Sequence, residues 1–469
     1  MEYKAQVVSE VKIAPRLIIH GGAGNISRPT SGDDKYADYR DALLAIVTKT
    51  AAYMNAVDKG TGKRPSALDT ATFAVTQLED NPLFNAGHGA VFTRDGINEL
   101  ESSVMVSRGY LKRGVGVMGL RRVRNPILLA KAMLEHGDVD LGGPGSHPSA
   151  VDDVEEESHL DVPSAQGHTQ IHGEAAESLA RKYGLDMVKP SYFFTQKRWD
   201  EHIKALEREK KGTGLSTWSA DEYLPQGTVG AIALDDDGVV CCATSTGGLT
   251  NKLTGRIGDT PTVGAGFWAE EWVEEGNTTG VSQDKSLFQR MLDYSKQPGP
   301  VVSFSESLRG LLADCLLTPF NYNPIPNGES RKTRTTRSIA LSGTGNGDSF
   351  LRVGAARTAG AIARFARQPG SVAVSRVSGP GGELQASAGN RWGRTGEGEG
   401  GLIGIECVVV RDEAGRTIET RSEILQDFNC NGMFRTWIDD DGKAQVRVWR
   451  DDEEEVFRCG FNDLERISA

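Results

Sequence analysis

No histidine lies beyond His202 in this chain of 469 residues, because all eight histidines stand at that position or before it. The densest polar motifs begin only at Gly227, so a Ser-His-acid hydrolase would need His20 or His88 as its base. The "HGG" at His20 is similar to the oxyanion loop of some esterases, but no G-x-S-x-G elbow occurs. We therefore interpret His20 as a strand-end histidine that pairs with the backbone, and keep the histidine-based hydrolase as the weaker alternative.

Cysteine is also scarce, and its spacing is not that of a metal centre. The six cysteines show no paired ligand spacing, and His168 and His172 lie in a glycine-containing stretch that need not be helical. Cys241 and Cys242 are adjacent, so they should point to opposite faces of a strand as buried, reduced thiols. The sequence therefore predicts no catalytic metal, and it fits a reducing, cytoplasmic compartment.

The chain also lacks an excess of basic residues and long apolar runs. The net charge of -11 and pI near 5.4 argue against general nucleic-acid binding. The one basic cluster, "RKTRTTR" from Arg331 to Arg337, is interpreted as a solvated loop. No apolar run approaches the ~20 residues that span a bilayer, and the N-terminus does not resemble a secretory signal. We expect neither nucleic-acid nor membrane partners.

Glycine, in contrast, is abundant, with 56 residues in strands, turns and polar stretches. Strand patterns and helix patterns come in groups, which favours sheets packed on each other with helices outside. The polar stretches at 137–170 and 376–401 are expected to be a mobile insert and a loop, and 211–227 a linker. The expected helices cover 39–57, 67–79 (with Ser66 as N-cap), 126–136, 174–183, 196–209 and 348–365, with two more from about Asp284 and after Ser303. The expected strands cover 16–20, a segment ending near Val106 after a hairpin around "RDG", 338–343, 401–412, 429–438 and 443–452.

A β-hairpin from Thr228 to Thr246, with "DDDG" as its turn, raises the question of mechanism. A threonine needs no histidine if it is the first residue of a chain, because its own α-amine, with a pKa of about 8, serves as the base. A cut before Thr228 would create that residue. Gly227 suits such a cut, since glycine allows a strained backbone and leaves the carbonyl unshielded.

The residues around this hairpin supply further functional groups. Thr246 ends the partner strand, so its hydroxyl can lie near Thr228 and hydrogen-bond to it. Arg256 and Asp259 lie in the glycine-rich "GRIGDTP". A guanidinium for a carboxylate and a carboxylate for an ammonium are what an amino-acid substrate requires.

The segment "GTVGAIALDDDGVVCCATSTGGLTNKLTGRIGDTPTVGAGFWA" resembles the plant-type asparaginases, also called isoaspartyl peptidases, of the N-terminal nucleophile hydrolase superfamily. "LIIHGGAGNI" and "NPLFNAGHGAVFTRDGINELESSVM" are similar to the N-terminal half of the same family. The resemblance implies an α+β fold, a four-layer αββα sandwich. It also implies autocleavage between Gly227 and Thr228 into an α fragment (1–227) and a β fragment (228–469), and a dimer of the cleaved pairs.

The resemblance also implies a role for each site residue. Thr228 would be the nucleophile and base, supported by Thr246. Arg256 and Asp259 would hold the substrate α-carboxylate and α-amine. Further contacts are implied for Thr344 and Gly345 of "GTG" with the oxyanion, and for Gly347 and Asn85 with the substrate. Catalysis would need no cofactor, but family members often hold a structural sodium ion by backbone carbonyls, here those of Leu78, Glu79, Asn81, Phe84, Ala86 and His88.

Some positions depart from the family pattern. Asn346-Gly347-Asp348 follows "GTG" where an acidic residue and then an aliphatic element are usual, and His88 replaces an aliphatic residue. The two long inserts are similar to those of fungal relatives. The expected activity is hydrolysis of asparagine, of β-aspartyl dipeptides, or of both. A threonine endopeptidase of the aspartase type and an uncleaved, non-catalytic binding relative remain as alternatives.

Overall fold

The structure is a computed structural model that describes residues 11–28, 36–110, 114–140, 162, 164–211, 227–274 and 333–450. The helices expected from about Asp284 and after Ser303 lie outside these residues. So do most of the insert at 137–170 and most of the linker at 211–227. The mixed α and β content expected from the sequence is confirmed.

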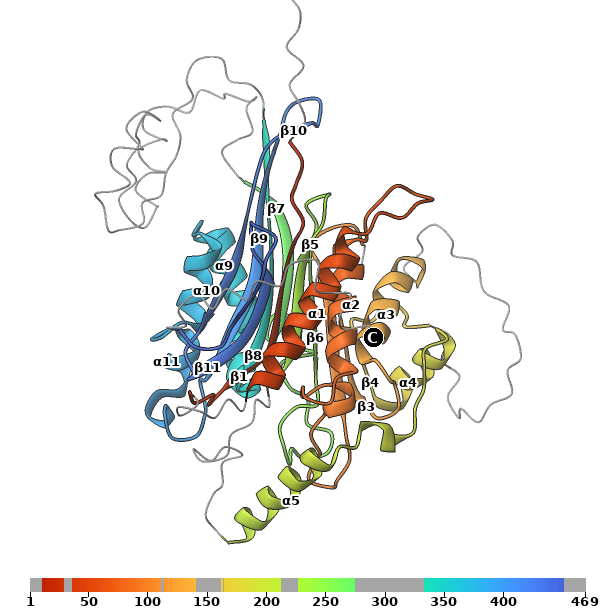
Figure 1. The fold of residues 1–469 in the computed structure, drawn as a ribbon, viewed down its shortest axis with the longest axis vertical. Coiled ribbons are helices and arrows are strands. Elements are labelled where there is room, and N and C mark those ends of the chain that lie inside the picture. The colour runs from red at the N-terminus through yellow and green to blue at the C-terminus, as the bar shows by residue number, and fades with distance from the viewer. Residues whose placement is uncertain are drawn as a thin grey trace, which may run out of the picture.

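Two β-sheets form the centre of the described part of the chain (Figure 1). The eight-stranded sheet has the order β12-β11-β1-β5-β6-β2-β3-β4, and the four-stranded sheet has the order β10-β9-β8-β7. Only the β3–β4 pair among them is parallel. The first sheet comprises β1 (Arg16–Gly24), β2 (Leu100–Val106), β3 (Gly114–Leu120), β4 (Gln170–His172), β5 (Val229–Leu234), β6 (Val240–Thr246), β11 (Gly432–Ile438) and β12 (Ala444–Arg447). The second comprises β7 (Phe267–Val273), β8 (Arg334–Gly345), β9 (Gly400–Arg411) and β10 (Thr417–Phe428).

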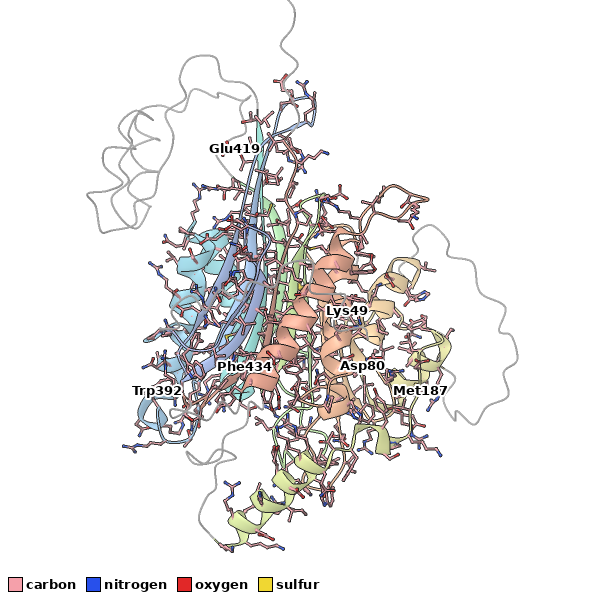
Figure 2. All side chains as sticks on the ribbon, in the orientation of Figure 1. Lys49, Asp80, Met187, Trp392, Glu419 and Phe434 are labelled. Carbon is pink, nitrogen blue, oxygen red and sulfur yellow. The ribbon has the colours of Figure 1, made fainter. Side chains whose placement is uncertain are left out.

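Helices cover the outer faces of both sheets (Figure 1). The first group is α1 (Ala37–Asn55), α2 (Ala67–Glu79), α3 (Pro126–Asp140) and α4 (Gly173–Lys182). The helix α5 (Gln196–Lys210) projects beyond the sheets (Figure 1), and the short turns η1 (Gly87–Gly89) and η2 (Pro190–Phe193) precede it in the chain. The second group is α8 (Gly347–Val353), α9 (Ala355–Phe365), α10 (Gly370–Ser378) and α11 (Glu383–Ala388), with η3 (Gly389–Arg391). In Figure 2, Phe434 of β11 lies beneath α1, where it stacks on Tyr39 with ring centroids 5.3 Å apart. The predicted N-cap of α2 is confirmed, since Ser66 Oγ accepts the Asp69 N–H at 3.1 Å.

The two adjacent cysteines of β6 mark the two faces of the larger sheet. Cys241 packs in the core shared with the first helix group, and Cys242 packs in the core between the two sheets. A third core lies between the smaller sheet and α8–α11. The expectation of opposite-facing, buried thiols is thus confirmed, and both cysteines are free.

Two sequence-based expectations in the C-terminal half are wrong. The single helix expected over 348–365 is two helices, because Gly354 adopts a left-handed conformation (φ 56°) between α8 and α9. The stretch 376–401 is not a plain loop, since it contains the end of α10, all of α11 and η3, and the start of β9. Earlier in the chain, α3 extends to Asp140, into the expected insert. Short helices in glycine-rich sequence escape periodicity because they offer too few turns to define a face.

The interpretation of the basic cluster as a solvated loop is wrong for its C-terminal part, which includes Arg337. Residues from Arg334 onward belong to β8, and Arg337 is buried. Its Nε donates to Glu406 Oε1 at 2.5 Å and its Nη2 donates to the Gln368 carbonyl at 2.6 Å. Glu406 in turn accepts the Gly370 N–H at the start of α10. A buried ion pair therefore joins the smaller sheet to its covering helices.

Arg337→Met should lower the free energy of unfolding by about 3–5 kcal/mol, because it leaves the Glu406 carboxylate buried without its partner. The matched control is Arg334→Met, at an exposed position of the same strand, which should change it by no more than about 0.5 kcal/mol. Urea denaturation of both variants measures the difference. Equal effects of the two substitutions would show that the Arg337 pair does not stabilise the fold.

Candidate active site

The β5–β6 hairpin positions Thr228 at the edge of a buried region. Val229 pairs with Ser245, so Thr228 and Thr246 come opposite each other where the two strands end. Both threonines are buried. The hydroxyl of Thr246 accepts the Gly248 N–H at 3.0 Å, so it fixes the turn after β6. The structure brings the two predicted threonines together, and the supporting role of Thr246 stays a prediction.

The hydroxyl of Thr228 contacts a third threonine, which the sequence analysis missed. Thr228 Oγ1 lies 3.0 Å from Thr260 Oγ1, and both are buried. Thr260 directly follows Asp259 in "GDTP", which is the one signal that pointed to it. A threonine in a loop carries no pattern of its own, so only its position in space shows this contact.

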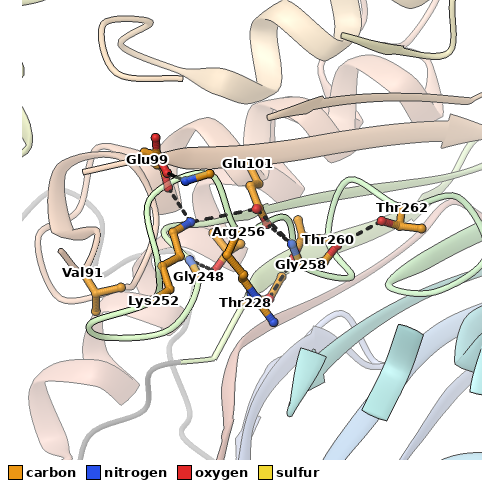
Figure 3. Close-up of polar contacts among 12 residues, drawn as sticks. Val91, Glu99, Glu101, Thr228, Gly248, Lys252, Arg256, Gly258, Thr260 and Thr262 are labelled. Carbon is orange, nitrogen blue, oxygen red and sulfur yellow. Dashed lines mark hydrogen bonds and ion pairs between the residues drawn. The ribbon is translucent and has the colours of Figure 1, made fainter. Parts of the chain in front are cut away.

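A network of hydroxyls fixes Thr260 from the opposite side. The carbonyl of Thr260 accepts from Ser103 Oγ at 2.6 Å and from Thr244 Oγ1 at 3.5 Å. Ser103 and Thr244 also hydrogen-bond to each other across β2 and β6. The main chain of Thr260 is thus held by two strands, and this orients its side chain toward Thr228 (Figure 3).

Gly227 packs so tightly that no side chain fits at its position. An added Cβ would overlap Thr344 Oγ1 and lie 2.6 Å from the Ala23 nitrogen and 2.7 Å from Gly22 Cα. Its φ lies outside the left-handed region. Glycine was expected here because it allows a strained backbone. In the structure, glycine is needed because no Cβ fits at this position.

Thr344 presents an unpaired hydroxyl to the residue before Thr228. Thr344 is fully buried, and its Oγ1 has no hydrogen-bond partner among the described residues. The following Gly345 has φ 145°, and a Cβ there would overlap the Glu399 carbonyl and Gly400 Cα of the neighbouring chain segment. The Thr344 hydroxyl therefore lies against Gly227, and its contact with an oxyanion stays a prediction.

His20 lies inside the site as a neutral group. Its Nε2 hydrogen-bonds with Ser342 Oγ at 2.7 Å, and the expected pairing with the backbone is a hydrogen bond with Thr228. Burial lowers the pKa of His20 to about 3, and a hydrogen bond with the Thr228 backbone acts in the opposite direction. A histidine with that pKa is a poor general base near neutral pH.

Arg256, Asp259 and Gly347 converge at the exposed side of the site. A Cβ on Gly347 would lie 2.5 Å from Asp259 Oδ1 and 3.1 Å from Arg256 Nη2, so the glycine backbone lies directly against both groups. Asp259 Oδ2 is buried and has no hydrogen-bond partner among the residues described. The structure therefore brings together the guanidinium, carboxylate and glycine that were predicted to bind a substrate.

Burial raises the pKa of the Asp259 carboxyl to about 7, although the nearby Arg256 charge acts in the opposite direction. Glu101 and Asp348 add to the increase through their negative charges. A carboxyl with this pKa gains most from an incoming cation, because a positive charge would replace the solvation that burial removed.

Two glutamates hold the loop that carries Arg256 (Figure 3). Glu101 of β2 accepts the Gly258 N–H at 3.0 and 3.2 Å. Glu99 accepts the Gly255 N–H at 2.7 Å, and its carbonyl accepts from Lys252 Nζ at 3.0 Å. Burial lowers the pKa of Lys252, and the charge of Glu101, 3.9 Å away, opposes that shift. The sequence analysis missed all three charged groups, because their role depends on contacts between distant segments.

Asn85 links a second loop to the end of β6. Its Nδ2 donates to the Gly248 carbonyl at 2.8 Å and its Oδ1 accepts the Val91 N–H at 3.0 Å. These two contacts are to the backbone, so Asn85 positions the loop beside Thr246. Direct contact with a substrate stays a prediction.

Gly87 and Gly89, in and beside the loop from Leu78 to His88, lie directly against backbone carbonyls of that loop. A Cβ at Gly87 would overlap the Glu79 carbonyl, and one at Gly89 would overlap the Phe84 carbonyl and lie 2.7 Å from that of Pro82. Glu79 Oε2 is buried without a hydrogen-bond partner in the described part of the chain. Burial raises the pKa of Glu79 to about 8, while Ser245 and the Ile127 N–H, which donate to Oε1, act against this. These groups fit a cation held by backbone oxygens.

Several known proteins are similar to this chain in sequence. The chain is 39% identical to the isoaspartyl peptidase of Escherichia coli over 267 residues, which is 57% of this chain and 71% of that protein. It is 34% identical to a putative isoaspartyl peptidase/L-asparaginase of Dictyostelium discoideum, over 56% of this chain and 72% of that protein. It is 32% identical to the plant-type L-asparaginase of Pyrobaculum calidifontis, over 61% and 81%.

A family model described as asparaginase matches residues 13–157 and 160–284, which is more than half of the chain. The matched ranges include Thr228, Thr246, Arg256 and Asp259. They end before Thr344. The strand β8 nevertheless brings Thr344 against Gly227, next to Thr228. By this match and by the arrangement of the site, the chain belongs to the asparaginase family of plant-type asparaginases and isoaspartyl peptidases.

Proposed function

We propose that this protein is a self-processing threonine amidohydrolase that releases aspartate from L-asparagine, from β-aspartyl dipeptides, or from both. The observation that carries the proposal is the packing of Gly227 against Thr344 beside the buried Thr228 hydroxyl. The names of its relatives, isoaspartyl peptidase and plant-type L-asparaginase, support the same substrate classes.

The proposed architecture is the four-layer αββα sandwich of N-terminal nucleophile hydrolases. It is supported by the three cores, one between the sheets and one between each sheet and its helices. In such an arrangement Gly227, just before the start of β5, packs against Thr344 of the other sheet.

Maturation would begin with attack of Thr228 Oγ1 on the Gly227 carbonyl carbon. The Gly227–Thr228 C–N bond breaks, the nitrogen becomes the free α-amine, and an ester joins Gly227 to the threonine oxygen. Water then hydrolyses that ester. The Thr344 hydroxyl supports the negative charge on the carbonyl oxygen, and Thr260 orients the attacking hydroxyl.

Turnover would use the same atoms on a bound substrate. Arg256 and Asp259 hold the α-carboxylate and α-ammonium, so the side-chain carbonyl carbon is presented to Thr228. The α-amine of Thr228 takes the hydroxyl proton and passes it to the leaving ammonia or amine. Water then hydrolyses the β-aspartyl ester to give aspartate and restore the threonine.

A monovalent cation such as sodium would fit the loop cradle near Glu79. The backbone carbonyls of Leu78, Glu79, Asn81, Phe84, Ala86 and His88 are the proposed ligands. The cation would supply a fixed positive charge that holds the loop. Within the chain, Arg198 already binds this loop, since its Nε donates to the Gly89 carbonyl at 2.8 Å.

We also propose association of the cleaved pairs into a dimer, and a cytoplasmic location. The location is supported by the four cysteines in the described residues, Cys241, Cys242, Cys407 and Cys430, all of which are free. In the described part of the chain, none of the helices combines the length and hydropathy needed to cross a bilayer.

A threonine endopeptidase shares the nucleophile but requires a peptide on both sides of the cleaved residue. The paired Arg256 and Asp259 oppose that alternative, because they match the free carboxylate and free amine of an amino acid. Comparing the rates of hydrolysis of L-asparagine and of a β-aspartyl dipeptide decides which substrate the protein prefers.

Thr228→Ala should remain a single chain and lose hydrolysis of both substrates by roughly 10⁴-fold or more, because it removes the nucleophile. Thr228→Ser, which keeps a hydroxyl and an α-amine, should still be cleaved and retain turnover. Ammonia release from L-asparagine and aspartate release from a β-aspartyl dipeptide measure the two activities. If the alanine variant hydrolysed either substrate at the wild-type rate, Thr228 would not be the nucleophile.

Thr260→Val should lower kcat by about five- to tenfold, since it removes one hydrogen bond to the nucleophile at nearly constant shape. KM should change little, because the Thr260 hydroxyl bonds to Thr228 and is not one of the charged groups proposed to hold the substrate. Thr260→Ser keeps the hydroxyl and should stay close to wild type. Valine and serine variants with the same kcat would show that the Thr228 contact plays no part in turnover.

The Asp259 carboxyl predicts a pH dependence of ligand binding. Because its pKa is raised to about 7, it is protonated below that pH and cannot pair with an ammonium. The Kd of L-aspartate should therefore rise as pH falls below 7, by up to about tenfold per pH unit. Succinate, which lacks the α-amine, is the matched ligand. Calorimetric titrations in which both ligands weaken equally would refute the assignment of Asp259.

A further inference from the structure

The carboxylate of Asp348 lies beside the Arg256 guanidinium, which is proposed to bind the substrate. Asp348 Oδ2 lies 3.2 Å from Arg256 Nη2. The Arg256 side chain is 18% exposed and that of Asp348 is 59% exposed, so the pair lies at the mouth of the site. Asp348 belongs neither to the "GRIGDTP" motif around Arg256 nor to the "GTG" motif, so neither motif predicted this contact.

The position of Asp348 is fixed by its own short helix. Asn346 caps α8 by accepting the Ser349 N–H at 3.0 Å, and Asp348 lies in the first turn. Gly347, the residue before it, is the one that lies directly against Asp259 and Arg256. The backbone therefore delivers the Asp348 carboxylate to the edge of the pocket in which the ligand's charged groups would bind.

Two carboxylates compete when they require the same guanidinium N–H. A guanidinium binds a carboxylate best through two parallel N–H···O bonds. While Nη2 is bonded to Asp348, Arg256 cannot offer its full fork to a ligand. Glu101 does not share this role, because its carboxylate is engaged by the Gly258 N–H.

We propose that Asp348 is a specificity-determining residue, an internal carboxylate that competes with the substrate's α-carboxylate for Arg256. The proposal rests on the proposed function, in which Arg256 binds that group. Asp348 then weakens the binding of substrates with a free α-carboxylate. It has no such effect on substrates in which that group is an uncharged amide.

The expected effect is modest, because the pair is partly exposed to solvent. Exposed ion pairs contribute about 0.2–1 kcal/mol, which corresponds to up to about a fivefold change in affinity. Asp348→Asn removes the charge at nearly constant size. It should lower KM for L-asparagine about two- to fivefold and leave kcat unchanged.

The experiment compares L-asparagine with L-asparaginamide, whose α-carboxyl is an amide. In Asp348→Asn, the ratio of kcat/KM for asparagine to kcat/KM for asparaginamide should rise by the same factor as the KM decrease. Glu383→Gln is the matched control, since Glu383 is an exposed carboxylate in the first turn of another short helix, α11. That control should keep the wild-type ratio.

The outcomes separate the two proposals. An unchanged ratio in Asp348→Asn would overturn the inference. A higher KM for asparagine would also overturn it, because Asp348 would then hold Arg256 in place for the substrate. Absence of turnover by the wild-type chain with asparagine and with a β-aspartyl dipeptide would instead overturn the proposed function, and the inference with it.

Discussion

The close packing of Gly227 between Ala23 and Thr344 is the constraint on which the site depends. It joins the first strand of one sheet, the end of β8 in the other sheet and the residue before the nucleophile. A larger residue at this position would overlap Thr344 and the backbone of Gly22 and Ala23. The two-sheet fold thus brings the buried Thr228 and the Thr344 hydroxyl, which has no partner among the described residues, to either side of Gly227.

Charge is distributed unevenly around this point. Among the described residues, the Thr228 hydroxyl is surrounded by hydroxyls, backbone groups and a neutral histidine. The binding side contains Arg256 with Asp259, Glu101 and Asp348 around it. Glu101 and Asp348 raise the pKa of Asp259, and Asp348 also pairs with the guanidinium. Substrate affinity therefore depends on how these carboxylates share one cation and one incoming ammonium.

Sequence analysis predicted the elements whose residues carry a local signal. The hairpin from Thr228 to Thr246 and the helix capped by Ser66 follow from alternation, turn chemistry and capping. The opposite-facing Cys241 and Cys242 follow from the two-residue period of a strand. Arg256 and Asp259 were found because their chemistry matches an amino acid.

The remaining features depend on contacts between distant segments. The ion pair that buries Arg337 requires Glu406 from the next strand, so a run of basic residues gave no hint of burial. The role of Thr260 depends on a turn that returns to Thr228, and that of Asp348 depends on the break at Gly354 and the short helix before it. Periodicity cannot reveal a partner that lies far away in the chain.

Denaturing mass spectrometry of the wild-type protein after prolonged incubation tests the central claim most directly. The account predicts two fragments, residues 1–227 and 228–469, with the second beginning at Thr228. Intact chain as the sole species, or a cut at any other bond, would contradict the account, because Thr228 would then lack the free α-amine that it needs as a base.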